Sequence, residues 1–377
     1  MERLQCQKAA FTLPEGTHYL NCAYMSPASR RVQEAGIAGV RRKGNPAAIT
    51  ADDFFEDVDE VRRLFAKLVH APVAERVSVI PSVSYGISTV ARNTRIERGQ
   101  SVVSVLHQFP SNTHPWERLC ADTGAEMKIV EPPTDGPDRA ADWNEAILNA
   151  IDTDTGVVCL GAVHWADGTP FNLGPIGERA REVGATFVVD GTQSVGAVPF
   201  DFATIRPDAL VCATYKWLMG PYSMALAYYG PCFDDGVPLE ESWMSREGSR
   251  DFAGLVNPAV SYRPGGARFD VGETANFALV PMVIAALEQV LEWGVDRINA
   301  YCRDLSGQYF PGMGHLFSLR LPADVDPAAV KAHLQERGVA VSVRGHAIRV
   351  SPNVYNDAAD MVALVHALED CGAAVHE

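Results

Sequence analysis

The sequence alternates between short valine-rich apolar runs and segments with helical periodicity, and this alternation limits the possible folds more than any other feature. Four runs that end in a polar or glycine-containing turn are SVVSVLHQF, GVVCLGAVHW, TFVVDGTQ and ALVCATYKW. Near-continuous apolar runs of this length are typical of strands that are buried on both faces. Strands that alternate with helices imply βαβ crossovers. The sequence therefore predicts an α/β fold with a mostly parallel sheet that is covered by helices on both sides.

The extent of this alternation divides the chain into domains. We predict an N-terminal arm over residues 1–20, a large domain over 21–260, and an interdomain segment with a small α+β domain over 261–377. In the large domain, apolar residues recur at helical spacing in DFFEDVDEVRRLFAKLV and, after a serine-rich turn, in IPSVSYGISTVARN. Both segments are therefore predicted to form helices.

The small domain is predicted from strands in HLFSLRLP, VAVSVRG and AIRVSP and from two helices. The first helix has Asp326 at its N-cap, Pro327 in its first turn and Gly338 just past its end, which are residues that favour helix boundaries. The second helix is predicted to start at Asn356 and to bury one apolar face.

Composition argues against several kinds of partner. The 377 residues carry a formal net charge of −15, which argues against nucleic acid because phosphate backbones are bound by clustered Lys and Arg. No apolar stretch approaches the roughly 20 residues that span a bilayer, and the first residues lack the apolar core of a signal peptide. The eight cysteines are scattered singly, which indicates reduced thiols. We therefore expect a cytoplasmic protein without a membrane partner.

Reactive or aromatic side chains follow the four apolar runs. In an open α/β sheet the ligand site lies beyond the carboxyl ends of the strands. The residues at these ends are Phe109, then His164 with Trp165, then Asp190, and then Lys216. No metal-ligand spacing is found around them, including at His107, His114 and Asp167, so no metal site is expected.

Lys216 is one of six lysines and follows the apolar run ALVCAT. An uncompensated ammonium is costly in such surroundings. Burial lowers the pKa of a lysine by up to about 3–5 units, which makes the amine nucleophilic toward carbonyl compounds near neutral pH. Alternatively, the side chain reaches water and has no chemical role.

Asp190 ends the run FVV, where a carboxylate requires a cationic partner. The protonated ring nitrogen of pyridoxal phosphate is such a partner, since sites for this cofactor supply a lysine for the aldehyde and an anion for the ring nitrogen. A buried ion pair of Asp190 with Lys216 is the alternative. The cofactor's phosphate needs donors at a helix N-terminus, which Ser82 and Ser84 offer ahead of Gly86, although an ordinary helix cap has the same sequence.

The ordered set of motifs resembles the class V aminotransferases, a family of fold-type I pyridoxal-phosphate enzymes that includes cysteine desulfurases, kynureninases and isopenicillin N epimerase. The resemblance is carried by VVDGTQSVGAVPFD and DALVCATYKWLMGP, and by YLNCAYMSP, SVSYGI, FPSNTHPW, ARFDVGETANF and AIRVSPNVYN. It covers nearly the whole chain and implies a mostly parallel seven-stranded sheet in the large domain. It also implies a homodimer in which the partner completes each active site.

The resemblance further implies roles for individual residues. Lys216 would be linked covalently to pyridoxal 5'-phosphate, and Asp190 would pair with the ring nitrogen. Arg349 would bind the substrate carboxylate with help from Asn21. The other implied cofactor contacts are Gln193 at the phenolic oxygen, Phe109 on the ring face, Val83, Ser84 and Tyr215 at the phosphate, and Gly272, Glu273 and Thr274 at the partner's phosphate. Trp165 stands where an asparagine often reaches the ring oxygen, and the neighbouring His164 is either a second acid or base or a structural histidine.

Two departures from the family disfavour cysteine desulfurase activity. Desulfurases carry a persulfide-forming cysteine on a loop shortly before the carboxylate-binding arginine, and the segment from Gly338 to Arg349 contains none. Desulfurases also have histidines where this chain has Phe109 and Tyr215, as in the kynureninase and epimerase style.

The expected reaction begins when an α-amino acid forms an external aldimine with the cofactor and loses its α-proton to Lys216. Reprotonation at the cofactor carbon gives transamination, which we expect. Loss of a β-substituent, as in a C–S lyase, and epimerisation are the alternatives, followed by kynureninase-type hydrolysis. A non-enzymatic cofactor-binding module is disfavoured because Lys216, Asp190, Gln193 and Arg349 are all present. The substrate side chain is not specified, and the candidates to surround it are Trp165, Tyr215, Trp243, Arg246, Arg344 and His346.

Overall fold

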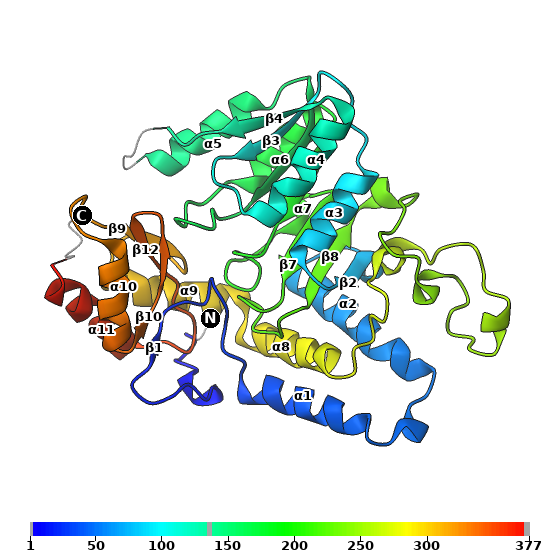
Figure 1. The fold of residues 1–377 in the computed structure, drawn as a ribbon, viewed down its shortest axis with the longest axis horizontal. Coiled ribbons are helices and arrows are strands. Elements are labelled where there is room, and N and C mark those ends of the chain that lie inside the picture. The colour runs from blue at the N-terminus through cyan, green and yellow to red at the C-terminus, as the bar shows by residue number, and fades with distance from the viewer. Residues whose placement is uncertain (1–2, 134–137, 373–377) are drawn as a thin grey trace.

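A seven-stranded sheet forms the centre of the large domain in the computed structural model, which describes residues 3–133 and 138–372 (Figure 1). The strand order is β2-β8-β7-β6-β5-β3-β4. The strands are β2 (Val77–Ile80), β3 (Ser101–Val105), β4 (Glu126–Val130), β5 (Thr155–Gly161), β6 (Thr186–Asp190), β7 (Ala209–Ala213) and β8 (Ala225–Tyr229). Every neighbouring pair is parallel except the two pairs that β8 makes. The four valine-rich runs form β3, β5, β6 and β7, which confirms the predicted mostly parallel sheet.

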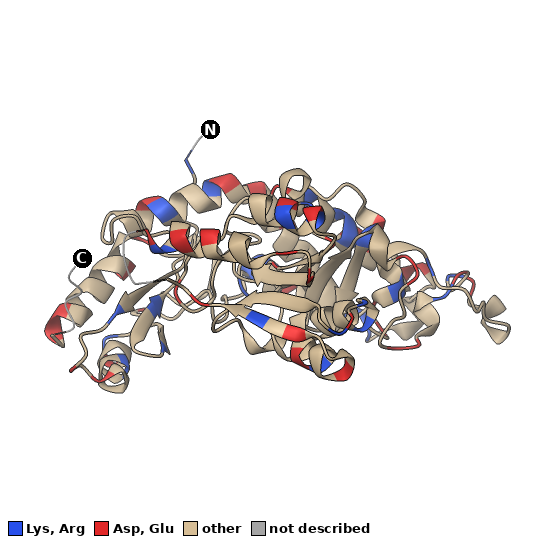
Figure 2. Ribbon diagram, turned by 90° about the horizontal axis from the view of Figure 1, so that it is seen from above, with Lys and Arg blue, Asp and Glu red and all other residues tan. Residues whose placement is uncertain are grey.

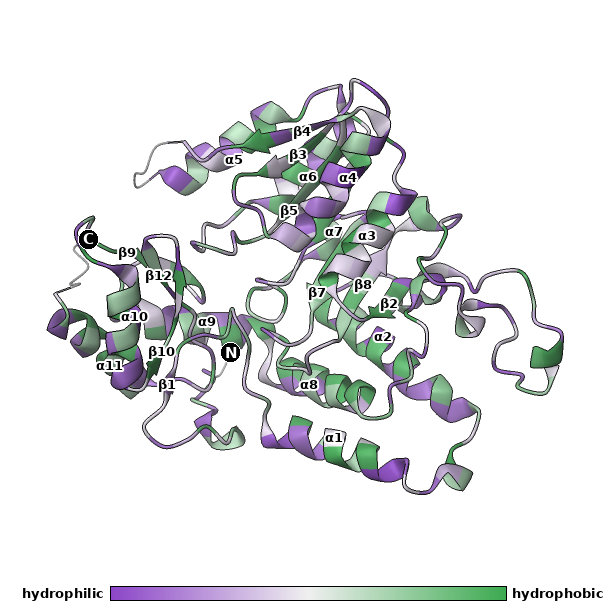
Figure 3. Ribbon diagram, in the orientation of Figure 1, coloured by the Kyte–Doolittle hydropathy of each residue, from purple (hydrophilic) through white to green (hydrophobic). Residues whose placement is uncertain are grey.

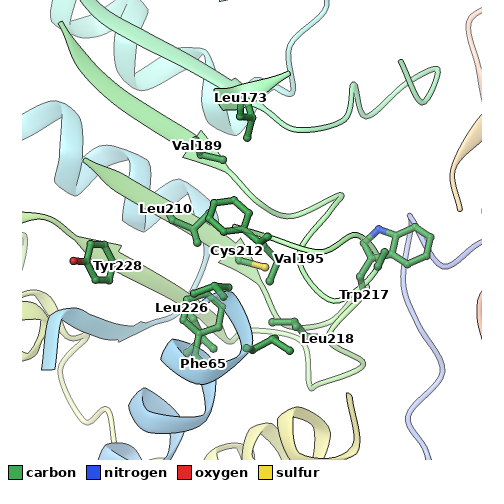
Figure 4. Close-up of a cluster of buried hydrophobic side chains, with 14 of the residues drawn as sticks. Phe65, Leu173, Val189, Val195, Leu210, Cys212, Trp217, Leu218, Leu226 and Tyr228 are labelled. Carbon is green, nitrogen blue, oxygen red and sulfur yellow. The ribbon is translucent and has the colours of Figure 1, made fainter. Parts of the chain in front are cut away.

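Helices cover both faces of this sheet, and consecutive strand residues pack on opposite faces. Val189 of β6 belongs to a core shared with α2 (Glu56–Val69), α5 (Arg139–Ala150), α6 (Leu173–Glu182) and α8 (Leu279–Trp293). Its neighbour Val188 belongs to a second core shared with α3 (Val83–Asn93) and α4 (His114–Thr123). Figure 4 shows part of the first core, where Val189, Leu210 and Leu226 lie on adjacent strands and Leu226 lies beside Phe65 of α2. The runs lack alternating polar positions because neither face of the sheet meets water.

Hydropathy follows this layering (Figure 3). The strands of the large sheet and α8 are coloured hydrophobic, whereas α1 (Arg30–Arg42), which packs against α8, mixes polar and apolar residues. The short α7 (Phe202–Ile205) precedes β7. The helix predicted over DFFEDVDEVRRLFAKLV starts three residues late, at Glu56, because Phe54 belongs to the preceding 3₁₀ turn η3 (Asp52–Phe54).

The small domain combines an antiparallel sheet with helices. Its strand order is β11 (Ser342–Arg344), β12 (Ala347–Val350) and β9 (Phe317–Arg320). Its helices are α10 (Pro327–Glu336) and α11 (Ala358–Asp370), with α9 (Val295–Gly307) leading in from α8. The Asp326 side chain caps α10 as predicted, accepting from the Ala328 N–H at 2.9 Å.

The predicted start of the last helix at Asn356 is wrong by two residues. Asp357 is the N-cap of α11 and forms a capping box with Asp360. Asn356 is buried instead, and its side-chain amide donates to the Tyr19 carbonyl at 3.0 Å. The tertiary contact with the N-terminal segment thus takes Asn356 out of the capping position.

The N-terminal segment crosses from the small domain to the large one. Strand β1 (His18–Tyr19) pairs in parallel with β10 (Val339–Ala340), and Asn21 bridges to Ser351. The buried Cys22 follows, with its thiol 3.7 Å from the carbonyl oxygen of Lys216. The domain boundaries at residues 20 and 260 stay predictions.

A long irregular excursion follows β8 and extends away from the sheet at the right of Figure 1. It contains the short 3₁₀ helices η6 (Pro231–Phe233), η7 (Trp243–Ser245), η8 (Gly254–Val256) and η9 (Gly265–Phe269). Two of its apolar side chains, Val256 and Val260, are 82% and 87% exposed. The remaining 3₁₀ turns are η1 (Lys8–Ala10), η2 (Pro46–Ala48), η4 (Ala74–Arg76) and η5 (Pro110–Asn112).

Acidic and basic residues intermingle along the helices in Figure 2, on a chain whose net charge is −15. In residues 3–133 and 138–372, no helix is both long and apolar enough to cross a bilayer.

Candidate active site

A cavity of about 290 Å³ opens where the carboxyl ends of β5, β6 and β7 meet the N-terminus of α3. This is the position at which open α/β sheets bind ligands. The predicted site residues that line it are Val83, Ser84, Phe109, Trp165, Asp190, Gln193, Tyr215 and Lys216. The structure therefore gathers into one cavity side chains that are more than 130 residues apart in the chain.

Lys216 lies in the tight connection between β7 and β8. Its carbonyl accepts from the Met219 N–H at 3.1 Å, and the buried Thr214 hydroxyl donates to the Pro221 carbonyl at 2.7 Å. The Lys216 side chain is 7% exposed. Burial lowers the pKa of its amine to about 8, an effect that the Asp190 carboxylate partly offsets. Roughly a tenth of the amine is therefore unprotonated at pH 7 and can attack a carbonyl.

Asp190 ends β6 and faces the same cavity. Burial raises the pKa of its carboxyl, and hydrogen bonding to Thr192 acts in the opposite direction, with the Thr192 N–H donating at 3.0 Å. Within the described chain, no ion pair joins Asp190 to Lys216. The two side chains affect each other's pKa without direct contact, and both line the cavity.

The side-chain amide of Gln193 is held in one orientation. Its oxygen accepts from the Trp217 indole N–H at 2.9 Å, and its nitrogen donates to the Ala23 carbonyl at 3.1 Å. The Gln193 carbonyl accepts from His315 at 2.8 Å. Burial lowers the pKa of His315 to about 4, so its ring is neutral. One amide N–H of Gln193 is left to point at an acceptor in the cavity.

The N-terminus of α3 borders the cavity through Ser82, Val83 and Ser84. The Ser82 hydroxyl caps the helix by accepting from the Tyr85 N–H at 3.1 Å, and it lies 2.9 Å from the Ser84 hydroxyl. The first turn of α3 contains no acidic residue. Free backbone N–H groups and the positive end of the helix dipole make such a site suitable for a phosphate.

Aromatic rings form one wall of the cavity. The Phe109 and Trp165 rings meet edge to face with centroids 5.3 Å apart, and the Lys216 amine lies 5.5 Å from the Phe109 centroid. The Trp165 indole N–H donates to the His107 carbonyl at 2.6 Å. The Trp165 ring lines the cavity, but its only hydrogen-bond donor is already used. Trp165 therefore offers a ligand an apolar surface.

Arg349 lies on β12 next to this wall, without lining the cavity itself. Its side chain is 1% exposed, and one terminal nitrogen donates to the Trp165 carbonyl at 2.8 Å. The other two nitrogens, Nε and Nη2, are buried and have no partner among the described residues. Burial, with a smaller effect from Arg344, lowers the pKa of Arg349 to about 9. A guanidinium with two unused donors fits a carboxylate ligand.

Asn21 lies near Arg349, across strand β11. Its side-chain oxygen accepts from the Ser342 hydroxyl at 2.8 Å, and Ser342 is the residue paired with Arg349 between β11 and β12. Asn21 is outside the cavity lining, as Arg349 is.

His164 is also outside the cavity lining. Its two ring nitrogens lie 3.0 Å from an Asp167 oxygen and 3.2 Å from the Leu106 carbonyl. Burial acts to raise the pKa of Asp167, but the hydrogen bond and charge interaction with His164, together with hydrogen bonds to Thr169, outweigh it and the pKa is lowered. With both nitrogens occupied and the ring buried, His164 has the contacts of a structural histidine.

Residues 272–274 lie away from the cavity of their own chain. The Gly272 N–H donates to Glu240 at 2.7 Å, and the Thr274 hydroxyl donates to the Val79 carbonyl at 3.4 Å. Glu273 is exposed and has a positive φ of 57°. Four candidates for the substrate pocket are also absent from the cavity lining, namely Trp243, Arg246, Arg344 and His346.

Several lining residues were missed in the sequence. Thr192 orients Asp190, and Tyr222 stacks on Tyr215 at 4.7 Å between centroids. Thr192 could have been found from its place two residues after a strand-end aspartate, where a backbone N–H commonly bonds the carboxylate. Gln108, Ser111 and Met224 carry no comparable signal.

Among the residues that the structure describes, no three His, Cys, Asp or Glu side chains are grouped to hold a metal ion.

The chain is similar in sequence and in fold to known enzymes. Residues 43–364 match the family model described as Aminotransferase class-V. The chain is 27% identical to the uncharacterized aminotransferase YcbU of Bacillus subtilis, over 96% of this chain and 95% of that protein. Its fold is similar to that of the cysteine desulfurase CsdA from Escherichia coli, with a TM-score of 0.81, 19% identity and 98% of each chain covered.

A third similar structure is a C-DES variant with glycine covalently linked to its PLP cofactor. Its TM-score is 0.84 at 17% identity, and the match covers 97% of this chain and 100% of that one. A further C-DES structure describes that protein as a cystine C-S lyase in complex with cysteine persulfide.

Proposed function

Because the chain belongs to the class-V aminotransferase family, we propose that it transfers the amino group of an α-amino acid, with Lys216 as the catalytic residue. The enzyme depends on pyridoxal 5'-phosphate, as this family does. The observation that carries the proposal is the pairing of a buried Lys216 amine with the Asp190 carboxylate across one cavity.

The residues of the cavity fit this cofactor. The Lys216 amine is available for the aldehyde. Asp190 forms no ion pair within the described chain, and its carboxylate can accept from a protonated ring nitrogen. The remaining N–H of Gln193 suits the phenolic oxygen. The capped N-terminus of α3, with Ser84 and Val83, suits the phosphate. Phe109 offers a ring face beside the Lys216 amine.

The substrate would be held by its carboxylate. Two unused nitrogens of Arg349 can form a bidentate pair with the carboxylate, and burial makes these hydrogen bonds stronger than in water. Asn21 acts on the same site through Ser342. An amino acid anchored in this way would present its α-carbon to the cavity that Lys216 lines.

Lys216 would transfer the α-proton of the bound amino acid. When bound, pyridoxal phosphate withdraws electrons from the α-carbon of the amino acid that it carries. The Lys216 Nζ, with a pKa of about 8, can accept the α-proton and return it at another carbon. Asp190 would keep the ring nitrogen protonated, and the Phe109 and Trp165 rings, which line the cavity, would exclude water from the transfer.

The same residues would serve a C–S lyase, which is the second candidate because the similar C-DES structure is described as one. Cysteine desulfurase activity is less consistent with this chain. The segment from Gly338 to Arg349 contains no cysteine, and Cys22, whose thiol lies 3.7 Å from the Lys216 carbonyl oxygen, is fully buried. Burial raises the pKa of Cys22 to about 11, which opposes formation of a reactive thiolate.

We also infer a homodimer and a cytoplasmic location. The dimer is supported by the exposed Val256 and Val260 and by the position of residues 272–274 outside their own cavity. The location is supported by the eight cysteines, which are all free thiols. Sedimentation velocity tests the dimer directly, since a monomer at micromolar concentration contradicts it.

A single-turnover screen tests the reaction. The holoenzyme is mixed with individual L-amino acids without an oxo-acid acceptor, and the products are identified. Transamination yields the 2-oxo acid and one equivalent of pyridoxamine phosphate, and Lys216→Ala abolishes both. Release of pyruvate and a thiol compound without pyridoxamine phosphate contradicts the aminotransferase and supports the lyase.

A further inference from the structure

Arg344 lies beside Arg349 on one face of the small sheet. In the hairpin of β11 and β12, Arg349 is paired with Ser342 and Arg344 with Ala347. Residues two apart on a strand share a face, so the two arginines are diagonal cross-strand neighbours, roughly 7–8 Å apart. Their guanidinium carbons lie 5.4 Å and 5.9 Å from the centroid of the Trp165 ring, which lines the active-site cavity.

Both arginines also act on the catalytic amine. The charges of Arg349 and Arg344 each contribute to lowering the pKa of Lys216. Since such effects fall off with distance, both guanidinium groups lie close to the site at which an amino acid would react.

The two positive charges have no counterion in the described part of the chain, where no carboxylate forms an ion pair with either arginine. Arg344 donates to the Val343 carbonyl at 2.8 Å, and its Nε is buried without a partner. Burial lowers the pKa of Arg344, and its charge adds to the lowering of the pKa of Arg349. Two neighbouring cations that lack an anion are costly to hold together.

One substrate carboxylate would satisfy only Arg349. We propose that Arg344 binds a second carboxylate, so that the enzyme acts on α-amino acids with an acidic side chain. The planar guanidinium suits this role, because it can hold a carboxylate through two parallel hydrogen bonds. This inference rests on the proposed function and adds the class of its substrate.

The competing explanation is that Arg344 only packs on Trp165 through a cation–π contact. In that case its loss affects substrates of every charge alike. Substrate pairs that match in shape and differ in charge separate the two explanations, namely L-aspartate with L-asparagine and L-glutamate with L-glutamine.

The experiment compares kcat/KM of the holoenzyme for these pairs. The wild type is expected to favour the better acid over its amide by at least about tenfold, as expected for a charge-assisted hydrogen bond. Arg344→Met should lower kcat/KM for the acid by about 10- to 100-fold and shift the acid-to-amide ratio by the same factor. Arg344→Lys should restore part of the ratio. The control is Arg337→Met, which removes one exposed positive charge at the end of α10, where Arg337 pairs with Asp370, and it should keep the wild-type ratio.

A binding measurement makes the result independent of turnover. Calorimetry of the holoenzyme with succinate and with butyrate should show weaker succinate binding in Arg344→Met by at least about tenfold and a much smaller change for butyrate. Equal losses for acids and amides, or for succinate and butyrate, overturn the proposal. If no amino acid reacts, the proposed function fails, and the succinate measurement alone then decides whether Arg344 binds a second carboxylate.

Discussion

Burial lowers the pKa of Lys216 from 10.5 to about 8, and the Asp190 carboxylate acts in the opposite direction. The amine is nucleophilic because the apolar end of β7 and the tight connection to β8 remove it from water. Asp190 keeps the pKa of the amine from falling further. The amine can therefore both accept and release a proton near neutral pH.

This pKa predicts how cofactor attachment depends on pH. Only the unprotonated amine attacks the aldehyde, so the rate at which the cofactor-free protein binds pyridoxal phosphate should rise about tenfold per pH unit below pH 8 and level off above it. Stopped-flow absorbance between pH 6.5 and 10 measures this rate. Asp190→Asn removes the charge that raises the pKa of Lys216, so its midpoint should lie lower. A rate that still rises about tenfold per unit up to pH 10, as for an amine with the ordinary pKa of 10.5, contradicts the assigned burial.

Arg349 should show a trade-off between stability and function. Its guanidinium is 1% exposed and leaves two nitrogens unpaired. Burying a charged group without a partner is unfavourable, and Arg349→Met removes the charge while keeping most of the side-chain volume. The cofactor-free protein should therefore gain about 1–3 kcal/mol in its free energy of unfolding. The same variant should raise KM for amino acids by about 10- to 100-fold. Urea denaturation and steady-state kinetics on one preparation test both effects, and a destabilised variant with an unchanged KM contradicts the carboxylate role.

Helix α3 places the proposed phosphate site through its close approach to the sheet. Gly86, in its first turns, faces Ile80 of β2 and Val211 of β7, and a Cβ atom built there would lie 2.7 Å from a side-chain carbon of each. The glycine thus brings the N-terminus of the helix, with Ser82 and Ser84, down to the carboxyl ends of the strands.

Gly86→Val should therefore lower both stability and cofactor affinity. Overpacking against Ile80 and Val211 should cost about 1–3 kcal/mol, and lifting the helix should weaken binding of pyridoxal phosphate by at least several-fold. Gly307→Val is the control, because a Cβ atom at Gly307 meets nothing within 4 Å. Thermal unfolding and cofactor titration provide the two readouts, and equal effects of the two substitutions contradict this account of α3.

The two domains meet where the loop after β5 touches the small sheet. Arg349 donates to the Trp165 carbonyl, and Ser318 donates to the Ala166 carbonyl at 2.8 Å. Gly168 has a φ of +84°, and its Cα faces the Leu316 backbone so closely that a Cβ atom would collide with the carbonyl oxygen. The position of the proposed substrate anchor relative to Lys216 thus depends on how closely this loop approaches β9.

Gly168→Ala should separate the two domains at this contact. We expect kcat/KM to fall at least tenfold, mainly through KM, because a small displacement of Arg349 misplaces the substrate. Gly184→Ala is the matched control, since Gly184 has a similar φ of +76° but open space around its Cα. The control carries the backbone strain alone, so similar kinetics for the two variants contradict a role for the domain contact.

The α/β class, the four central strands, the capped helix α10 and the strand-end residues Asp190 and Lys216 could be predicted from the sequence. Local patterns carry this information, because burial on both faces demands continuous apolar runs and helix ends demand particular capping residues. The start of α11 could not be predicted, since Asn356 is withdrawn from the cap by a contact with Tyr19. The environment of His164 could not be predicted either. One of its two ring partners is Asp167, and the other, Leu106, follows the neighbouring strand β3.

The sequence was thus sufficient for the fold class, because apolar runs and helix caps have local physical requirements. The cofactor was inferred from the ordered set of motifs that resembles the class V aminotransferases, and the role of Lys216 stays a prediction. Tertiary structure decided the electrostatic state of the site. The lowered pKa of Lys216, the absence of an ion pair with Asp190 within the described chain, and the juxtaposition of Arg344 with Arg349 all depend on burial and distance between remote segments. Those quantities exist only once the two sheets are packed around the Trp165 loop, since desolvation and Coulomb interactions depend on separation in space and not in sequence.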